Sequence, residues 1–329
     1  MEHKAAHPET HHHKKPTPPD PPPPKPTPGT TTYTLVTEPD QGLTPIYNLL
    51  SSAKKSIDMT MYELSDTQVT TILTTAAARG VTVRVILDQN NEKANNTTAY
   101  NTLAAGKVQV HWANPVYLCT HQKTITVDGA TSAIMTLNFT PDYYSTSRDY
   151  AVITNNAADI AAIETTFNAD FTNASITPPT GDNLVWSPTN SRSSILALIN
   201  GATKSLLIAE QEMADKGIES ALKAALKRGV ALTLVQENIG GVYSSVLNTL
   251  KADGAKIAIF SSPTGFYNHS KVILADYGTA NAKLLVGSEN FSTDSLDKNR
   301  ELGLIFSDPA CMAGIDAAIT ADYNKGTKF

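Results

Sequence analysis

Apolar residues recur along the chain with two periodicities, one typical of helices and one typical of strands. Thr44-Pro45 resembles a helix N-cap followed by proline, and apolar residues then return at helical spacing. Alternating residues 56–63 predict a strand, and the β-branched run 81–88 predicts an inner parallel strand. Asp66 is placed to cap the helix between them, which Gly80 ends. The pattern predicts an α/β fold in which helices cover a sheet.

The same succession of elements returns in the second half of the chain. Residues 205–212 predict a strand, Asp215 caps a helix that ends at Arg228-Gly229, and residues 230–235 predict the next strand. Residues 56–89 align with this stretch without a gap at a constant offset of 149, as the pair Asp66 and Asp215 illustrates. Chance does not hold one offset over such a length, so we infer a duplicated β-α-β unit.

Each half closes with a predicted helix, over residues 157–171 in the first half and about 308–323 in the second. The turn-forming stretch 177–182 is the seam between the halves. We therefore expect lobe 1 over residues 33–177 and lobe 2 over residues 178–329, each a largely parallel or mixed β-sheet flanked by helices. Homologous lobes usually pack about a pseudo-twofold axis, which would bring equivalent strands together at the interface.

One short motif occurs in both halves at matching positions. Each copy has a His, a Lys two residues later, an Asp five residues after the Lys, and then a hydroxyl residue and an Asn. The first copy consists of His121, Lys123, Asp128, Thr136 and Asn138, and the second of His269, Lys271, Asp276, Ser288 and Asn290. Because side chains at i and i+2 of a strand point to one face, each His and Lys would look into the same cavity.

The two motifs resemble the His-x-Lys-x4-Asp signatures of the phospholipase D superfamily, and the resemblance covers essentially all of residues 33–329. It implies two phospholipase D-like lobes and a metal-independent phosphodiesterase with one active site shared between them. It implies no cofactor. By the same resemblance, Asp149 and Glu301, which follow the motifs at equivalent positions, would orient the histidines. The alternative is that Arg148-Asp149 and Arg300-Glu301 are ordinary surface ion pairs.

The motif residues themselves suit the cleavage of a phosphodiester. One imidazole can attack phosphorus, while the other protonates the leaving alcohol and later activates water. Lys123 and Lys271 can supply the positive charge that would otherwise need a metal ion, and the two asparagines can supply neutral donors. The N-terminal histidine is often the nucleophile in the family, so the resemblance implies attack by His121 and acid–base catalysis by His269. The sequence shows no spacing typical of a metal site.

The remaining motif residues have two expected roles. Thr136 and Ser288 are predicted to bind substrate through their hydroxyl groups. Asp128 and Asp276 are predicted to be structural, because each should lie at the far end of its strand and accept hydrogen bonds from turn amides.

The first copy departs from the family pattern, which usually has Gly-Ser before x-Asn. The second copy keeps Gly287-Ser288, whereas the first has Met135-Thr136. Met135 would add bulk where the backbone normally comes close to the site. The second copy is also four residues longer between Asp276 and Gly287. We expect activity nevertheless, because both sets of His, Lys and Asn are intact.

Composition narrows the function without identifying the substrate. The net charge of -5 argues against broad nonspecific attraction to nucleic acid or to anionic membranes. The two cysteines give no disulfide framework, and no apolar run approaches the length of a membrane span. Residues 115–118 and 263–267, which precede the two histidines, are apolar and aromatic. They could contact acyl chains or a headgroup, or stack on bases.

Phospholipid hydrolysis is the favoured prediction. A nuclease would need basic residues around its cleft, and no run of Lys or Arg lies near either motif. A nuclease of the same superfamily is the main alternative, followed by cardiolipin synthase-like phosphatidyl transfer and by an inactive binding protein. Tyr62-Glu63 and Gln211-Glu212 end equivalent strands and would either line the cleft or pack in the core. Both half-sites lie in one chain, so we expect a monomer.

Residues 1–32 are rich in His, Lys and Pro and predict a disordered, extended polyproline tail. The basic-then-apolar pattern of a signal peptide is missing from this stretch. A proline-rich tether is nevertheless common between an export signal or anchor and a globular body. We therefore expect a soluble protein, and export to the periplasm or beyond is a hypothesis that rests on this tail.

Overall fold

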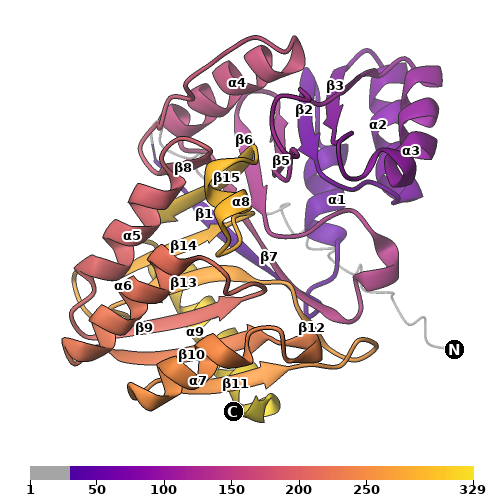
Figure 1. Cartoon of the computed structure of the whole chain (residues 1–329). Coiled ribbons are helices and arrows are strands. Elements are labelled where there is room, and N and C mark those ends of the chain that lie inside the picture. The colour runs from indigo at the N-terminus through magenta and orange to yellow at the C-terminus, as the bar shows by residue number, and fades with distance from the viewer. Residues whose placement is uncertain (1–29) are drawn as a thin grey trace, which may run out of the picture. The chain divides into compact units, whose positions relative to one another are not determined.

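The computed structural model describes residues 30–329, and residues 31–329 form one compact unit. The tail predicted over residues 1–32 falls, apart from residues 30–32, outside the described residues. Two mixed β-sheets flanked by helices make up the compact unit (Figure 1), which confirms the predicted two-lobed α/β fold. The lobes are halves of one body, and the predicted seam after residue 177 lies in the connection between α4 and β8.

The first lobe contains one sheet in the order β1-β7-β6-β5-β2-β3-β4, with β2, β3 and β4 parallel and the other pairings antiparallel. Its strands are β1 (Tyr33–Glu38), β2 (Ser56–Met61), β3 (Thr82–Leu87), β4 (Gln109–Trp112), β5 (Lys123–Val127), β6 (Thr131–Met135) and β7 (Ser147–Thr154). Its helices are α1 (Thr44–Ser51), α2 (Thr67–Ala78), α3 (Lys93–Ala105), the 3-10 turn η1 (Pro141–Tyr143) and α4 (Ala157–Phe171).

The second lobe repeats this plan in the order β16-β11-β10-β9-β13-β14-β15-β8. Its strands are β8 (Leu184–Ser187), β9 (Ser205–Glu210), β10 (Ala231–Glu237), β11 (Lys256–Phe260), β13 (Lys271–Ala275), β14 (Lys283–Gly287), β15 (Glu301–Phe306) and β16 (Thr327–Lys328). Its helices are α5 (Ser191–Gly201), α6 (Lys216–Lys227), the 3-10 turn η2 (Ile239–Gly241), α7 (Ser244–Ala252), α8 (Thr293–Asp297) and α9 (Pro309–Lys325). The short strand β12 (Tyr267–Asn268) belongs to this half of the sequence but pairs with β7 of the first sheet.

The predicted helix signals operate in both lobes. Asp66 accepts hydrogen bonds from the Gln68 and Val69 amides at the start of α2, and Asp215 accepts one from the Ile218 amide at the start of α6. Two glycines with φ of +95° and +90°, Gly80 and Gly229, follow these helices and end them in the left-handed conformation that glycine adopts freely.

A core built by both lobes explains why the compact unit is not divided. Each sheet has its own apolar cluster on one side, beneath helices α1–α3 or α5–α7. A third cluster combines buried residues of the two lobes, among them Tyr150 and Val152 from β7 and Leu302 and Leu304 from β15. Helices α4 and α9, the two predicted closing helices, also contribute apolar residues to this shared cluster. Separating the lobes would expose it to water.

Candidate active site

Two short parallel strand pairings between the lobes bring the two motifs together. Tyr267-Asn268 in β12 pairs with Ser147-Arg148 at the start of β7. The reciprocal pairing is a bridge between Thr120 and Arg300, where the His121 N–H donates to the Arg300 carbonyl over 2.9 Å. Each motif histidine therefore lies beside an acidic residue of the opposite lobe.

Carboxylates at the ends of the parallel strands anchor this arrangement. The Thr120 N–H donates to Asp88 over 2.8 Å, and the Asn268 N–H donates to Glu237 over 2.8 Å. Asp88 and Glu237 follow or end the equivalent strands β3 and β10 at the offset of 149. The chain thus fixes the residue before each histidine in the same way twice.

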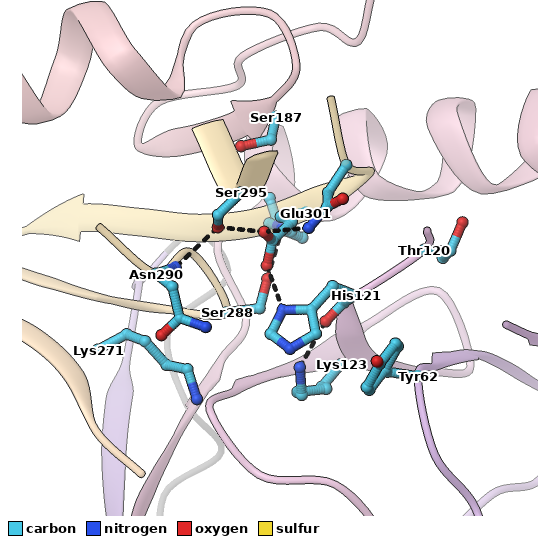
Figure 2. Close-up of polar contacts among 12 residues, drawn as sticks. Tyr62, Thr120, His121, Lys123, Ser187, Lys271, Ser288, Asn290, Ser295 and Glu301 are labelled. Carbon is cyan, nitrogen blue, oxygen red and sulfur yellow. Dashed lines mark hydrogen bonds and ion pairs between the residues drawn. The ribbon is translucent and has the colours of Figure 1, made fainter. Parts of the chain in front are cut away.

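The first histidine is held by an acid of the second lobe (Figure 2). His121 Nδ1 lies 2.5 Å from Glu301 Oε1, and the two side chains are 12% and 0% exposed. The other carboxylate oxygen accepts hydrogen bonds from the Ser295 hydroxyl and, over 3.2 Å, from the Asn299 amide. A carboxylate with these donors is fixed in one orientation and fixes the imidazole in turn.

The second histidine is held by an acid of the first lobe. His269 Nδ1 lies 2.7 Å from Asp149 Oδ1, and the Thr136 hydroxyl donates to that same oxygen over 2.6 Å. Because Nδ1 of each imidazole is engaged by a carboxylate, the Nε2 atom of each ring is left for chemistry. The arrangement offers two oriented imidazoles, each dependent on both lobes.

The alternative that the Arg-acid dipeptides are surface ion pairs is wrong. Both acids are buried, and each arginine binds a carboxylate elsewhere. Arg148 Nε donates to Asp322 of α9 over 2.7 Å, and Arg300 Nη2 donates to Asp170 of α4 over 3.1 Å. Asp170 and Asp322 are equivalent at an offset of 152, so each lobe's arginine reaches the closing helix of the other lobe. These reciprocal contacts are those expected of two lobes related by a twofold.

Both motif lysines are buried at the site. Lys123 and Lys271 start strands β5 and β13, so the strand begins two residues later than the sequence predicted and each histidine lies just before it. The ammonium of Lys123 donates to the His121 carbonyl over 2.6 Å, and that of Lys271 to the His269 carbonyl over 2.9 Å. Figure 2 shows the two lysines near the His121 imidazole, where they add positive charge.

Burial shifts the pKa of these groups downward. Desolvation, with Lys123 as the second cause, lowers the pKa of His121 to about 4. Desolvation, with Lys271 as the second cause, lowers the pKa of Lys123 to about 7. The pKa values of His269 and Lys271 are also lowered, by burial first. The two lysines repel each other, so an anion between them would be bound strongly.

The lysines differ in the residue that faces them across the sheet. Lys271 pairs with Glu210 in the register of β13 and β9, whereas Lys123 pairs with Met61 in the register of β5 and β2. Glu210 is fully buried, and one of its oxygens accepts a hydrogen bond from the Phe291 amide over 3.2 Å. We missed this residue in the sequence, where a glutamate at the end of an apolar strand was the available signal.

The two motif asparagines offer unsatisfied amide oxygens. Oδ1 of Asn138 and Oδ1 of Asn290 are both buried and lack a hydrogen-bond partner among the described residues. The backbone N–H of Asn290 donates to Ser295 over 2.8 Å, which holds that residue in place. Buried acceptors of this kind are normally satisfied by a ligand or a water molecule.

The structure differs from the prediction that Thr136 and Ser288 bind substrate. Both residues are fully buried, and each hydroxyl oxygen accepts a backbone N–H from the neighbouring strand, Tyr150 over 2.9 Å and Leu302 over 3.2 Å. The Thr136 hydroxyl proton is donated to Asp149. These side chains therefore support the strands that carry the acids, and Thr136 has no proton left for a substrate.

The motif aspartates accept amide hydrogen bonds, as predicted, but not in their own turns. Asp128 binds the N–H groups of residues 54–56, and Asp276 binds those of residues 203–205, at 2.7 to 3.1 Å. These amides belong to the connections that lead into β2 and β9. Each aspartate thus ties its motif strand to the neighbouring strand, away from the imidazoles.

The substitution of Met135 for glycine does not obstruct the site. Met135 is fully buried in the apolar cluster of lobe 1, where it pairs with Ala151. In lobe 2 the equivalent pair is Gly287 and Gly303, and a Cβ on Gly287 would lie 2.6 Å from the carboxylate of Glu289. The glycines therefore make room for a buried glutamate that lobe 1 replaces with an apolar residue. The concern raised by the sequence is wrong, because the bulk points into the core.

A cavity of about 610 Å³ opens on one side of the paired histidines. Its wall includes His269 and Asn138, the loop 140–147 of the first lobe and the segment 263–267 of the second. Glu63 and Gln211 line it as well, which resolves the choice between cleft and core for these two residues. The apolar segment before His269 thus borders the cavity, as the sequence suggested it could.

Among residues 30–329, no group of three or more His, Cys, Asp or Glu side chains is arranged to hold a metal ion. In the same part of the chain, no helix is both long enough and apolar enough to cross a membrane.

Sequence comparison finds the same duplication. The family model described as "Cardiolipin synthase, PLD-like domain" matches residues 46–171 and again residues 195–323. A protein named phospholipase D from Rickettsia conorii is 36% identical over 95 residues, which are 29% of this chain and 46% of that protein. The chain thus spans about half the length of the relatives it matches.

Comparison with solved structures extends over both lobes. A phosphatidylserine synthase from Haemophilus influenzae matches with a TM-score of 0.69 and 13% identity, covering 90% of this chain and 87% of that one. A polyphosphate kinase from Porphyromonas gingivalis also has a TM-score of 0.69, with 16% identity, covering 88% of this chain and 50% of that one. At such low identity the matches show a common fold.

Proposed function

The chain belongs to the family of phospholipase D-like domains that includes cardiolipin synthase, and from this premise we propose that it is a metal-independent phosphodiesterase that removes phospholipid headgroups. The observation that carries the proposal is the exchange of acids between lobes. His121 is held by Glu301 and His269 by Asp149, and both oriented imidazoles feel the charge of the same two lysines. That is the set of groups that double displacement at phosphorus needs.

In the first step we assign attack to His121. Burial keeps its pKa near 4, so the imidazole is neutral and nucleophilic at neutral pH. The bond from His121 Nε2 to phosphorus forms as the bond from phosphorus to the headgroup oxygen breaks, and the proton on His269 Nε2 passes to that oxygen. The products of this step are the free headgroup alcohol and a phosphohistidine that carries the phosphatidyl group.

In the second step His269 acts as a base. A water molecule gives a proton to His269 Nε2 while its oxygen bonds to phosphorus, and the bond between phosphorus and His121 breaks. His121 recovers its electron pair, and phosphatidic acid leaves. Asp149 stabilises the His269 imidazolium before the first step and after the second. An anionic phosphodiester offsets the charge of Lys271, which favours the proton on His269 once substrate is bound.

Exposed apolar side chains support a lipid substrate. The exposed large hydrophobic residues among residues 30–329 lie in three loops. Val116 and Leu118 precede His121, Tyr143 and Ile239 line the cavity, and Val242 follows Ile239 in the loop after β10. Clustering of such residues beside a site is typical of contact with apolar partners. Within the same part of the chain, the cavity wall includes no lysine or arginine, although a nucleic-acid channel would need them.

An assay panel without added metal tests the proposal. Purified protein is incubated with phosphatidylethanolamine, phosphatidylcholine, cardiolipin, single-stranded DNA and double-stranded DNA, and products are identified by mass spectrometry and gel electrophoresis. We expect release of headgroup alcohol and phosphatidic acid, no cleavage of DNA, and loss of turnover in His121→Ala and in His269→Ala. DNA cleavage without lipid turnover would overturn the substrate class. Full activity in either folded variant would overturn the shared site.

A further inference from the structure

The cavity beside the histidines lies on the His269 side of the site. His269 is part of its wall, whereas His121 is not among the described residues that line it. On the His121 side the equivalent loops meet, because the Leu118 N–H donates to the Lys298 carbonyl over 3.1 Å and Tyr117 packs on Arg300. Room for a bulky group of the substrate therefore exists next to His269.

The geometry of displacement decides which group enters this space. The attacking and leaving atoms lie on opposite sides of phosphorus, so the leaving oxygen faces the acid rather than the nucleophile. If His121 attacks and His269 protonates, the leaving alcohol must extend into the cavity. This step rests on the proposed function.

Charge in the cavity wall is one-sided. Glu63 and Asp142 line it, and among residues 30–329 no lysine or arginine does. The residue equivalent to Asp142 at the offset of 152 is Asp294, which forms an ion pair with Lys298 over 3.2 Å on the closed side of the site. No ion pair of this kind involves Asp142 in the described chain. The open side therefore favours the binding of a cation, whereas on the closed side Lys298 already provides the positive charge.

Unsatisfied acceptors in the wall call for a ligand with N–H donors. Oε1 of Gln211 and Oδ1 of Asn138 are buried, lack a hydrogen-bond partner among the described residues, and belong to cavity-lining side chains. The amide nitrogen of Gln211 donates to the Tyr267 hydroxyl over 2.8 Å, which leaves its oxygen as the free acceptor. A primary ammonium group brings positive charge and three donors, whereas a quaternary ammonium group brings charge alone.

Aromatic side chains complete the lining. Tyr143, Tyr144 and Tyr267 all contribute to the wall, and the faces of tyrosine rings attract cations. We propose that this cavity binds the leaving alcohol and selects one that carries a primary ammonium group, as in ethanolamine headgroups. Anionic and neutral headgroups lack the charge that Glu63 and Asp142 are placed to bind.

Competition among headgroups on identical acyl chains tests the inference. Mixed micelles containing phosphatidylethanolamine, phosphatidylcholine or phosphatidylglycerol are compared by kcat/KM. We expect phosphatidylethanolamine to exceed phosphatidylglycerol by about fivefold, the size of effect that a partly exposed charge pair of about 1 kcal/mol gives. Phosphatidylcholine should fall between them, because it has the charge without the donors.

Variants locate the preference in the cavity. In the double variant Glu63→Gln with Asp142→Asn, the ratio of kcat/KM for phosphatidylethanolamine over phosphatidylglycerol should fall to near one. In Gln211→Met, the advantage of phosphatidylethanolamine over phosphatidylcholine should disappear. Asp294→Asn, the matched change on the closed side, should leave every ratio as in the wild type.

The outcomes separate this inference from the function on which it rests. Turnover of all three lipids without preference would overturn the inference alone, and so would a preference that survives the double variant. Failure to turn over any phospholipid would overturn the proposed function and the inference together. Loss of the preference in Asp294→Asn would place the selecting charge outside the cavity and would also contradict the inference.

Discussion

The two half-sites agree in how each histidine is held and differ in what surrounds it. Each imidazole binds a carboxylate of the opposite lobe, and each preceding residue is bridged to the opposite lobe's strand. The lysines, however, face a glutamate in one half and a methionine in the other. The cavity of about 610 Å³ is lined by His269 and not by His121. Orientation of the imidazoles is thus common to both copies, while charge and access are specific to each.

This difference suggests how a duplicated site acquires a direction. A symmetric site would bind a phosphodiester equally well in either orientation. Here the cavity of about 610 Å³ lies beside His269. Burial first, and the neighbouring Lys271 second, lower the pKa of Lys123 to about 7. The second half has Glu210 opposite its lysine. We infer that the crossed acids maintain the chemistry in both halves, and that the unequal surroundings decide which histidine attacks.

The crossed acids should give the largest effects. In Glu301→Gln, the Ser295 and Asn299 donors hold the amide oxygen away from His121, so the amide nitrogen faces Nδ1 and the imidazole is held in the wrong tautomer. Asp149→Ala removes the acceptor of the His269 Nδ1 proton altogether. We expect kcat to fall by roughly 10³- to 10⁴-fold in each variant, as for the orienting acid of a Ser-His-Asp triad. Steady-state kinetics together with circular dichroism of the folded variants checks this. A fall in kcat in only one of the two variants would show that the histidine of the other half-site does not need its acid.

Removing the carboxylates that bind the buried arginines should give the next largest effects, and these are effects on stability rather than on catalysis. Asp170→Ala leaves Arg300, which is 1% exposed, without a carboxylate and should cost about 3–5 kcal/mol of unfolding free energy. Asp322→Ala leaves Arg148 with Asp40 at 3.1 Å and should cost less, about 2 kcal/mol. Urea denaturation measures both. Equal losses would contradict the view that Asp40 compensates in the first lobe.

The residue opposite the lysine should give the smallest effect, a shift in pH dependence. Lys123 loses its proton as pH rises through about 7, so kcat/KM of the free enzyme should fall on that limb. In Met61→Glu a carboxylate would face Lys123, favour its charged form and move the limb to higher pH by about one unit. Met61→Gln, which adds polarity without charge, serves as the control. If the alkaline limb of the kcat/KM profile stays at the same pH in Met61→Glu, Lys123 does not control that limb.

Much of the fold could be predicted because its signals are local. Asp66 and Asp215 mark helix starts by capping, Gly80 and Gly229 mark helix ends, and the offset of 149 held over residues 56–89 shows the duplication. The α4 helix begins and ends where the periodicity placed it. What the sequence does not contain is the register between lobes. The two-residue strand β12 is too short to leave a pattern, although it brings His269 to Asp149.

The site was predictable in its residue types and less so in its contacts. Pairs of motif residues stand out by repetition, so both histidines could be found. Which lobe provides the acid for each histidine depends on tertiary packing, and no local sequence pattern predicts it. Thr136 was expected to touch substrate because a hydroxyl near a site suggests binding, yet burial and its bond to Asp149 give it a supporting place. Glu210 was missed because the repeat has Met61 at that position.

Identification of the phosphorylated residue tests the central claim most directly. Wild-type protein is mixed with phosphatidylethanolamine, quenched in alkali to preserve the phosphorus–nitrogen bond, digested and analysed by mass spectrometry. We predict a phosphatidyl adduct on His121 that forms and decays during turnover. An adduct on His269 would reverse the direction assigned to the site. Turnover with no adduct on either histidine would contradict the account as a whole.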